Sequence, residues 1–231
     1  MYTLHPQLSC NTFYVGNEQS PVLVIDNLVT SPEQLIDIAC AQQFVSGGVF
    51  YPGIRAVTPL DYQKFLIAKV CPLLTDVFTL PQSGLGFSLC HFSLVTTPAS
   101  RLNGYQRIPH IDAVDRYGLA TLHYLFNKPL GGTDFYRHRA TGFETIDEHR
   151  KEYYFSILQQ EKPVLEQTPT SYMNGDTYTF EKIGSVEGVF NRMVVYHKNL
   201  LHSGAIAESF VPDTDPRNGR LSINCFIDIK K

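Results

Sequence analysis

Apolar and polar positions along the first part of the chain follow patterns that predict one strand and two helices. Residues 21–28 (PVLVIDNL) form a short β-rich run, which is typical of a buried strand. Residues 31–44 open with Ser-Pro, a helix-start signature, and then place apolar side chains on one side, which predicts an amphipathic helix. Thr58-Pro59 repeats this signature and predicts a second helix, which Pro72 divides.

Residues 47–55 (GGVFYPGIR) separate the two predicted helices and are rich in glycine and proline. This composition predicts a loop rather than a regular element. A loop of this kind could cover a binding site, because ligand-contacting segments are often loops.

After residue 85 the pattern changes to the period of two that β-strands show. A polar segment at about 144–160, with Tyr154 and Phe155 on one side, predicts an intervening helix. The strands are predicted at residues 86–97, 119–126, 133–136, 177–180, 192–200 and 219–229, with a Gly131-Gly132 turn before the third.

The last predicted strand has the clearest alternation. Arg220, Ser222 and Asn224 share one face, whereas Leu221 and Ile223 lie on the other. The polar face could lie in water, as in many antiparallel sheets. Alternatively, the apolar face packs on the N-terminal helices while the polar face lines a pocket.

The order of the elements predicts the fold class. The chain contains no internal repeat, low-complexity tract or linker, so residues 1–231 are expected to form a single domain. Residues 1–84 would supply an N-terminal strand and helical support, and residues 85–231 a β core with a helical insertion. We therefore expect a mainly β protein with helices (α+β), an antiparallel sandwich or jelly roll braced by N-terminal helices.

Composition excludes several classes of partner. The net charge of −3 and the 18% of charged residues provide no basic surface for nucleic acid or acidic lipid. No run of about 18 apolar residues and no signal-peptide pattern occur, so no membrane partner is expected. The five cysteines are scattered without a CxxC pair, which predicts neither a disulfide framework nor a structural zinc site and fits a cytoplasmic protein. Oligomeric state is not encoded in these patterns.

Candidate metal ligands occur at two distant places in the chain. His110 and Asp112 are two residues apart, so in an extended segment both side chains point the same way and can converge on one ion. A His on a later strand end, followed by an Arg on the next strand, would complete a two-His, one-carboxylate triad beside an anion clamp. Such a triad suits non-haem Fe(II). His202 is favoured over His197 as the third ligand, because His202 ends its strand whereas His197 lies within it.

These motifs together resemble the Fe(II)- and 2-oxoglutarate-dependent dioxygenases, whose core is a double-stranded β-helix. The resemblance covers about residues 87–229 and rests on His110-x-Asp112, on Leu-His-Ser-Gly at 201–204 and on Gly-Arg-Leu-Ser at 219–222. Residues 21–35 look like the N-terminal strand and helix of the prolyl-hydroxylase-like branch. Residues 122–136 (LHYLFNKPLGGTDFY) are similar to its hairpin, with one additional residue before the Asn. The polar segment 208–218 lengthens the usual gap between the last His and the Arg.

The resemblance implies a set of site residues. His110, Asp112 and His202 would hold Fe(II) and leave open positions for co-substrate and O2. Arg220 would bind the distal carboxylate of 2-oxoglutarate through its planar guanidinium. Tyr124 matches a position that often bonds the same carboxylate.

Other polar residues have weaker interpretations. Ser222, two residues after the Arg on the same face, could add a hydroxyl to the carboxylate site. Arg137-His138-Arg139 is either solvated or, at a pocket mouth, able to receive an acidic substrate.

The expected activity is that of a 2-oxoglutarate-dependent hydroxylase acting on a C–H bond. It would consume 2-oxoglutarate and O2, release succinate and CO2, and use ascorbate as an accessory reductant; the substrate is an unidentified small molecule, peptide or protein. Two alternatives remain open at this stage. One is a cupin-like metal-binding protein or non-oxygenase metalloenzyme with Zn or Mn, and the other is a catalytically silent jelly-roll binding module.

Overall fold

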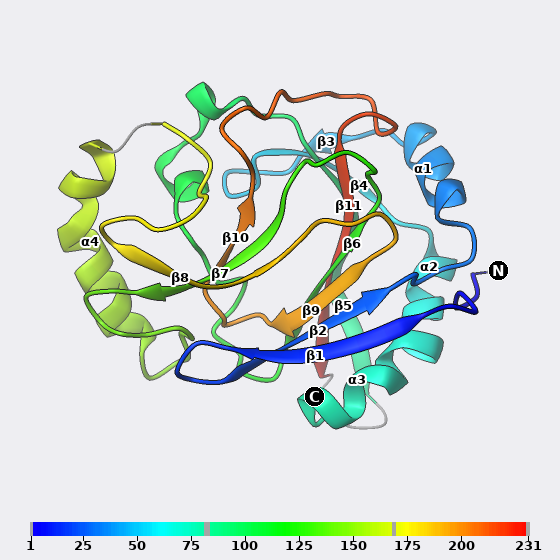
Figure 1. Ribbon diagram of the computed structural model, residues 1–231, viewed down its shortest axis with the longest axis horizontal. Coiled ribbons are helices and arrows are strands. Elements are labelled where there is room, and N and C mark those ends of the chain that lie inside the picture. The colour runs from blue at the N-terminus through cyan, green and yellow to red at the C-terminus, as the bar shows by residue number, and fades with distance from the viewer. Residues whose placement is uncertain (1, 81–83, 168–169, 230–231) are drawn as a thin grey trace.

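The strands of the computed structural model form two sheets that face each other, with helices on their outer sides (Figure 1). The structure describes residues 2–80, 84–167 and 170–229. Within these residues an eight-stranded sheet has the order β1-β2-β9-β6-β11-β5-β4-β3, and a three-stranded sheet has the order β10-β7-β8. The large sheet contains β1 (Ser9–Val15), β2 (Ser20–Asp26), β3 (Val45–Ser46), β4 (Gly53–Val57), β5 (Leu85–Val95), β6 (Leu119–Tyr124), β9 (Met193–His197) and β11 (Arg220–Ile229). The small sheet contains β7 (Gly132–His138), β8 (Phe180–Val186) and β10 (His202–Ala205).

From β5 onward the chain passes back and forth between the two sheets. It runs from β5 to a segment at His110 that bridges β10 and then returns to β6. It next forms the antiparallel pair β7–β8, whose connection contains α4, and then takes β9, β10 and β11 in alternate sheets. Neighbouring strands pair antiparallel. This winding is the double-stranded β-helix, or jelly roll, that the sequence predicted. The two sheets are not closed into a barrel.

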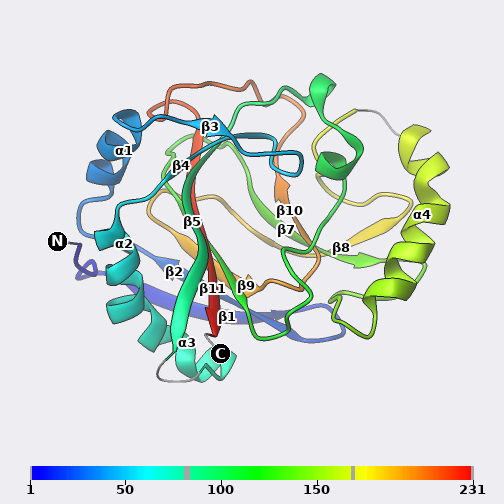
Figure 2. The same cartoon turned by 180° about the vertical axis from the view of Figure 1, so that it is seen from behind.

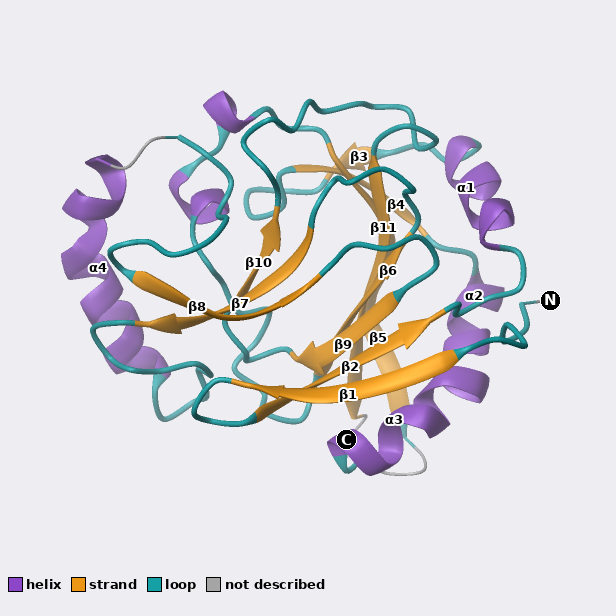
Figure 3. Cartoon of the chain, viewed as in Figure 1, coloured by secondary structure: helices purple, strands orange, loops and turns teal. Residues whose placement is uncertain are grey.

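Helices cover opposite sides of the molecule, as Figures 2 and 3 show. On one side, α1 (Pro32–Cys40), α2 (Leu60–Phe65), the π-helical turn Leu66–Val70 and α3 (Cys71–Phe78) pack on the large sheet. On the other side, α4 (Lys151–Gln167) packs on the small sheet through Tyr154. Among the described residues, no helix is long and apolar enough to cross a bilayer.

The two faces of β11 decide between the interpretations of that strand. Leu221, Ile223 and Cys225 belong to the apolar core beneath the N-terminal helices. Arg220 and Ser222 face the space between the sheets, and both are buried. Because β11 pairs with β5 on one side and β6 on the other, its polar face lines the interior rather than meeting water.

Several features differ from the sequence-based expectations. The short strand β3 precedes the loop predicted at residues 47–55, and β4 begins within it, because β4 pairs with β3 and β5 despite the neighbouring glycines. The predicted helix at 144–160 begins later, at Lys151, and Ser9–Val15 forms an edge strand that its weak apolar pattern concealed. The structure also joins Cys90 to Cys225 in a disulfide, because strand pairing places these residues opposite each other across 135 residues of sequence.

A buried polar network links α2 to the large sheet. His123 Nε2 lies 3.1 Å from Asn191 Oδ1, and His123 Nδ1 lies 3.0 Å from the Tyr62 hydroxyl. The side-chain oxygen of Asn191 only accepts, so Nε2 donates and the neutral ring accepts the Tyr62 hydroxyl at Nδ1. Burial lowers the pKa of His123 from its ordinary 6.5 to about 4.

We expect this histidine to make stability sensitive to acid. Because the unfolded chain takes up the proton at a higher pH than the folded chain, the free energy of unfolding falls as the pH drops from 6.5 towards 4. Urea titrations at pH 7 and pH 5 should show wild type losing about 2 kcal/mol more than His123→Gln over this interval. Parallel pH profiles for the two proteins would contradict the assignment.

Candidate functional site

Backbone pairing brings the two distant histidines together. The His110 amide donates to the His202 carbonyl at 2.9 Å, and the His202 amide donates to the His110 carbonyl at 3.0 Å. On its other side β10 pairs with β7, so His202 is held opposite Phe135. The two imidazole centroids lie 4.4 Å apart as a result.

Asp112 reaches the same place through a second attachment of its loop. Its amide donates to the carbonyl of Lys198 at 2.8 Å. Lys198 is itself buried, and its ammonium pairs with the carboxylate of Asp228 on β11. The loop is therefore hydrogen-bonded to the start of β10 at His110 and to the β9–β10 connection at Asp112.

The ligand-type atoms of these residues surround one point. Asp112 Oδ1 lies 3.8 Å from His110 Nε2, and Asp112 Oδ2 lies 3.5 Å from His202 Nε2. One ligand atom from each of the three residues lies within 4.8 Å of the others. These separations are too long for strong hydrogen bonds and suit groups that share a central ion.

Hydrogen bonding and burial prepare His202 as a ligand. Its Nδ1 lies 2.8 Å from the Leu200 carbonyl, which can only accept, so Nδ1 carries the proton and the Nε2 lone pair is free. Burial lowers the pKa of His202 to about 4, so the ring is neutral at pH 7. Desolvation and the neighbouring His202 shift the pKa of His110 in the same direction. Burial raises the pKa of Asp112, while His110 and Arg55 oppose that shift.

The site opens on the side of His110. About half of the His110 side chain is exposed (51%), compared with 13% for Asp112 and 6% for His202. Two imidazoles and one carboxylate on a single side of a common centre leave the other side available to small ligands. This donor set is the facial arrangement that suits non-haem Fe(II).

Arg220 begins β11 and is buried between the sheets, with 4% of its surface exposed. Its Nε donates to the Leu130 carbonyl at 3.0 Å and its Nη2 to the Gly132 carbonyl at 2.7 Å. The turn that presents these carbonyls depends on glycine. Gly131 has φ +84°, and a Cβ on Gly132 would lie 1.9 Å from the Val186 carbonyl oxygen.

Tyr124 and Ser222 lie opposite each other in the β6–β11 pair, near the guanidinium. The Tyr124 hydroxyl is 2.7 Å from the Thr133 hydroxyl. Ser222 donates its hydrogen to Asn224 Oδ1 at 2.7 Å. As placed, Ser222 has no hydrogen left to donate to a carboxylate, whereas the Tyr124 and Thr133 hydroxyls together retain one.

The sequence profile described as "Family of unknown function (DUF6445)" matches residues 6–227. The chain belongs to this family. Among curated proteins, none matches this sequence.

Solved structures similar to this DUF6445 member share its fold at low identity. HygX from Streptomyces hygroscopicus with nickel and 2-oxoglutarate bound is 12% identical, with a TM-score of 0.53 over 91% of this chain and 83% of that chain. The epimerase SnoN in complex with Fe3+, alpha ketoglutarate and nogalamycin RO is 13% identical, with a TM-score of 0.53 over 91% and 79%. The alpha ketoglutarate dependent carbocyclase SnoK is 10% identical, with a TM-score of 0.51 over 91% and 80%. The DUF6445 chain thus has the fold of the iron- and 2-oxoglutarate-dependent oxygenases.

Among the described residues of the DUF6445 chain, no other histidine joins the three candidate ligands. His197, the competitor of His202, packs edge-on against Phe78 of α3 at 5.2 Å between ring centroids. His123 belongs to the network beneath α2. His91 Nδ1 is buried without a hydrogen-bond partner among the described residues.

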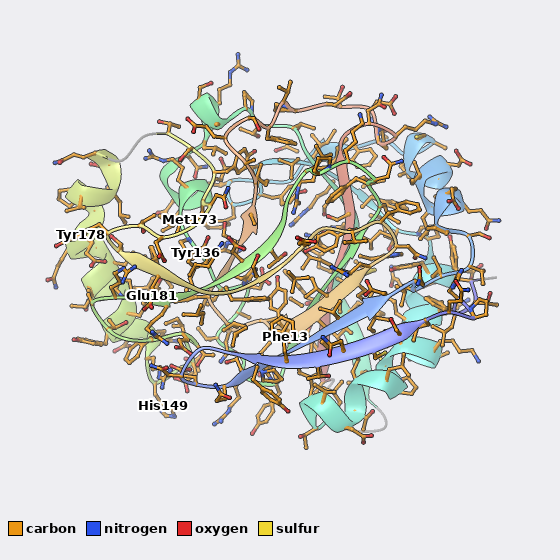
Figure 4. All side chains as sticks on the ribbon, in the orientation of Figure 1. Phe13, Tyr136, His149, Met173, Tyr178 and Glu181 are labelled. Atoms are coloured by element: carbon orange, nitrogen blue, oxygen red, sulfur yellow. A yellow bond between two sulfur atoms is a disulfide. The ribbon has the colours of Figure 1, made fainter. Side chains whose placement is uncertain are left out.

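The cationic run on β7 is neutralised by acidic residues. Arg137 pairs with the buried Glu144 and with Glu181, which Figure 4 labels on β8 near α4. His138 is buried against Glu161 of α4 at 2.7 Å. Arg139 lies 3.6 Å from Asp176. These contacts join the run to β8, to α4 and to the segments that flank α4, and they leave no support for its role as a receptor of acidic substrates.

Several residues near the site were not found from the sequence. Tyr196 on β9 lies 4.7 Å from His202 between ring centroids, and its hydroxyl is buried without a hydrogen-bond partner in the described part of the chain. Nothing in its apolar strand MVVYH marks this tyrosine. Arg55 on β4 could have been found, because apolar Ile54 and Ala56 alternate with it in a strand pattern.

We expect His202 and not His197 to control metal affinity. Titration of Mn(II) into the protein, followed by electron paramagnetic resonance, should show at least a ~100-fold weaker affinity in His202→Ala, because one of three ligands is lost. His197→Gln is the matched control and should bind Mn(II) as wild type does. Equal losses in the two variants, or full affinity in His202→Ala, would exclude the assigned centre.

Proposed function

We propose that this protein is an Fe(II)- and 2-oxoglutarate-dependent oxygenase that hydroxylates a C–H bond of its substrate. The observation that carries the proposal is the joint arrangement of three neutral or anionic metal-type ligands and a buried arginine on the facing sheets of this fold. Tyr196 lies between the two parts, because its ring contacts His202, and the pKa of its hydroxyl is raised by burial and by Asp112 and lowered by Arg220.

The charge on Arg220 supports a co-substrate site. Within the described residues, no carboxylate lies within 4.0 Å of its guanidinium, although the residue is almost completely buried. A buried charge without a counter-ion is costly, and two carbonyl acceptors offset only part of that cost. A carboxylate of 2-oxoglutarate would complete the pair and accept the remaining guanidinium hydrogens.

The residues present fit both absent groups. Two imidazoles, one held as the Nδ1–H tautomer, and the carboxylate of Asp112 would bind Fe(II). Arg220 would orient 2-oxoglutarate, and the unpartnered Tyr196 hydroxyl could donate to it or to a water beside it. When bound, iron and co-substrate would supply the redox chemistry in which 2-oxoglutarate and O2 become succinate and CO2 and the substrate gains a hydroxyl oxygen.

The protein's own contribution would be binding, orientation and exclusion of water. The Leu130 and Gly132 carbonyls fix the plane of the Arg220 guanidinium before any ligand arrives. The apolar side chains of Val194, Phe135 and Leu200 line the interior next to the ligands and keep it dry. A preorganised and dry site of this kind strengthens every electrostatic contact that it makes.

Replacing Arg220 should separate an oxygenase from a metal-binding protein that does not use 2-oxoglutarate. Calorimetric titration of 2-oxoglutarate into the Mn(II)-loaded protein should show at least a ~30-fold weaker affinity for Arg220→Gln, because the carboxylate loses its charged partner. Arg217→Gln removes an exposed arginine that pairs only with Asp37, so it should bind as wild type does.

Activity provides the second half of this test. With Fe(II), ascorbate and a substrate panel, wild type should convert 2-oxoglutarate to succinate only when O2 is present, and Arg220→Gln should lose most of that conversion. A wild-type protein that neither binds 2-oxoglutarate with metal nor turns it over would contradict the proposal.

A further inference from the structure

A second arginine, Arg55, faces the space between the two sheets from β4, two strands away from β11. Arg55 on β4 lies opposite Ser93 on β5, and Ser93 lies opposite Ser222 on β11. Residues paired in this way point to the same face of a sheet. Arg55 therefore shares the face that carries Arg220, two residues before Ser222.

Arg55 has no acidic partner in the structure. None of the ion pairs among the described residues includes it, and its Nε is buried without a hydrogen bond. Its guanidinium carbon lies 4.1 Å from the ring centroid of Tyr51, which holds the fork in a fixed orientation. An arginine stays charged in proteins, so Arg55 contributes a cation without an ion-pair partner to the space between the sheets.

Two neighbouring hydroxyl groups, those of Tyr51 and Ser93, lie next to this cation. The Tyr51 hydroxyl and the Ser93 hydroxyl are buried, and neither makes a hydrogen bond of good geometry among the described residues. Burial raises the pKa of Tyr51 to about 12, while Arg220 and Arg55 oppose the shift. Tyr51 thus remains a donor at neutral pH and lies close to both arginines.

The loop that carries Tyr51 is attached beside the metal-ligand segment. The carbonyl of Val49 accepts from Asn103 Nδ2 at 2.8 Å and from Gln106 Nε2 at 3.1 Å. These two donors belong to the turn that directly precedes His110. The charge of Arg55 acts to lower the pKa of both Asp112 and His110, which agrees with a position of Arg55 at the edge of the candidate metal centre.

We infer that Arg55, Tyr51 and Ser93 form a carboxylate-binding subsite for the substrate, next to the co-substrate site at Arg220. This inference rests on the proposed oxygenase function and names its substrate class, a molecule with a free carboxylate. The guanidinium fork would receive the two carboxylate oxygens, and the Tyr51 and Ser93 hydroxyls would donate to them.

Charge and exposure favour this assignment. Arg220 is almost completely buried, whereas Arg55 is partly exposed and next to the opening at His110, where a substrate that arrives after 2-oxoglutarate would enter. The single positive charge of the Arg55 guanidinium neutralises the single negative charge of one carboxylate. A phosphate would bring about two negative charges next to Asp112, and like charges that close repel.

The test uses Mn(II)-loaded protein saturated with 2-oxoglutarate and matched pairs of probes. Each pair is an N-acetyl amino acid and its neutral carboxamide, which differ only in the carboxylate. Broadening of the probe's proton NMR signals by bound Mn(II) reports weak binding close to the metal without any need for turnover. Glycerol phosphate serves as the phosphate probe.

We expect acids to be broadened and their amides not. Arg55→Gln should weaken acid binding at least tenfold while its affinity for 2-oxoglutarate stays within about threefold of wild type. Arg55→Lys keeps the charge without the fork and should lose less. Arg217→Gln, which removes an exposed arginine that pairs with Asp37, should match wild type.

Three results would overturn the inference. They are equal or absent broadening of acids and amides in wild type, preferential binding of glycerol phosphate, and loss of 2-oxoglutarate binding in Arg55→Gln. Failure of the oxygenase proposal looks different, because wild type would then not bind 2-oxoglutarate in the calorimetric titration that precedes the probe experiment.

Discussion

The backbone pairing of His110 with His202 is the constraint on which the site depends. Ninety-two residues separate the two histidines, and a pair of antiparallel hydrogen bonds makes them neighbours. β10 is in turn fixed by β7, and the carbonyl of Lys198 fixes Asp112. Because main-chain contacts rather than side-chain contacts set these positions, the three ligand side chains are held in place before an ion binds.

The large sheet buries polar groups on both of its faces, and on the helix-facing side Thr121 Oγ1 and His197 Nδ1 lack partners among the described residues. On the helix-facing side of the large sheet, the polar atoms of His123 and Asn191 are partnered. On the other face, two arginines lack ion-pair partners and the hydroxyls of Tyr196 and Ser93 make no hydrogen bond of good geometry among the described residues. Native proteins rarely leave buried charges without a counter-ion, so the two arginines on the face between the sheets support a binding site that accepts anions.

Much of this arrangement could be predicted from the sequence, and the rest follows from pairing that sequence does not show. The period-two pattern of residues 219–229 predicted a strand with one polar face, and the His-x-Asp motif with a later His predicted the ligand set. β4 and its residue Arg55 were missed because the glycines and the proline at 47–53 predict a loop. The Cys90–Cys225 disulfide was missed because only strand register brings these residues together.

A crystal structure of the protein crystallised without oxygen, with Mn(II) and 2-oxoglutarate, tests the central claim most directly. We predict Mn(II) bound by His202 Nε2, a His110 ring nitrogen and an Asp112 oxygen, with the distal carboxylate of 2-oxoglutarate on the Arg220 guanidinium. Mn(II) at other side chains, or 2-oxoglutarate bound away from Arg220, would contradict the account.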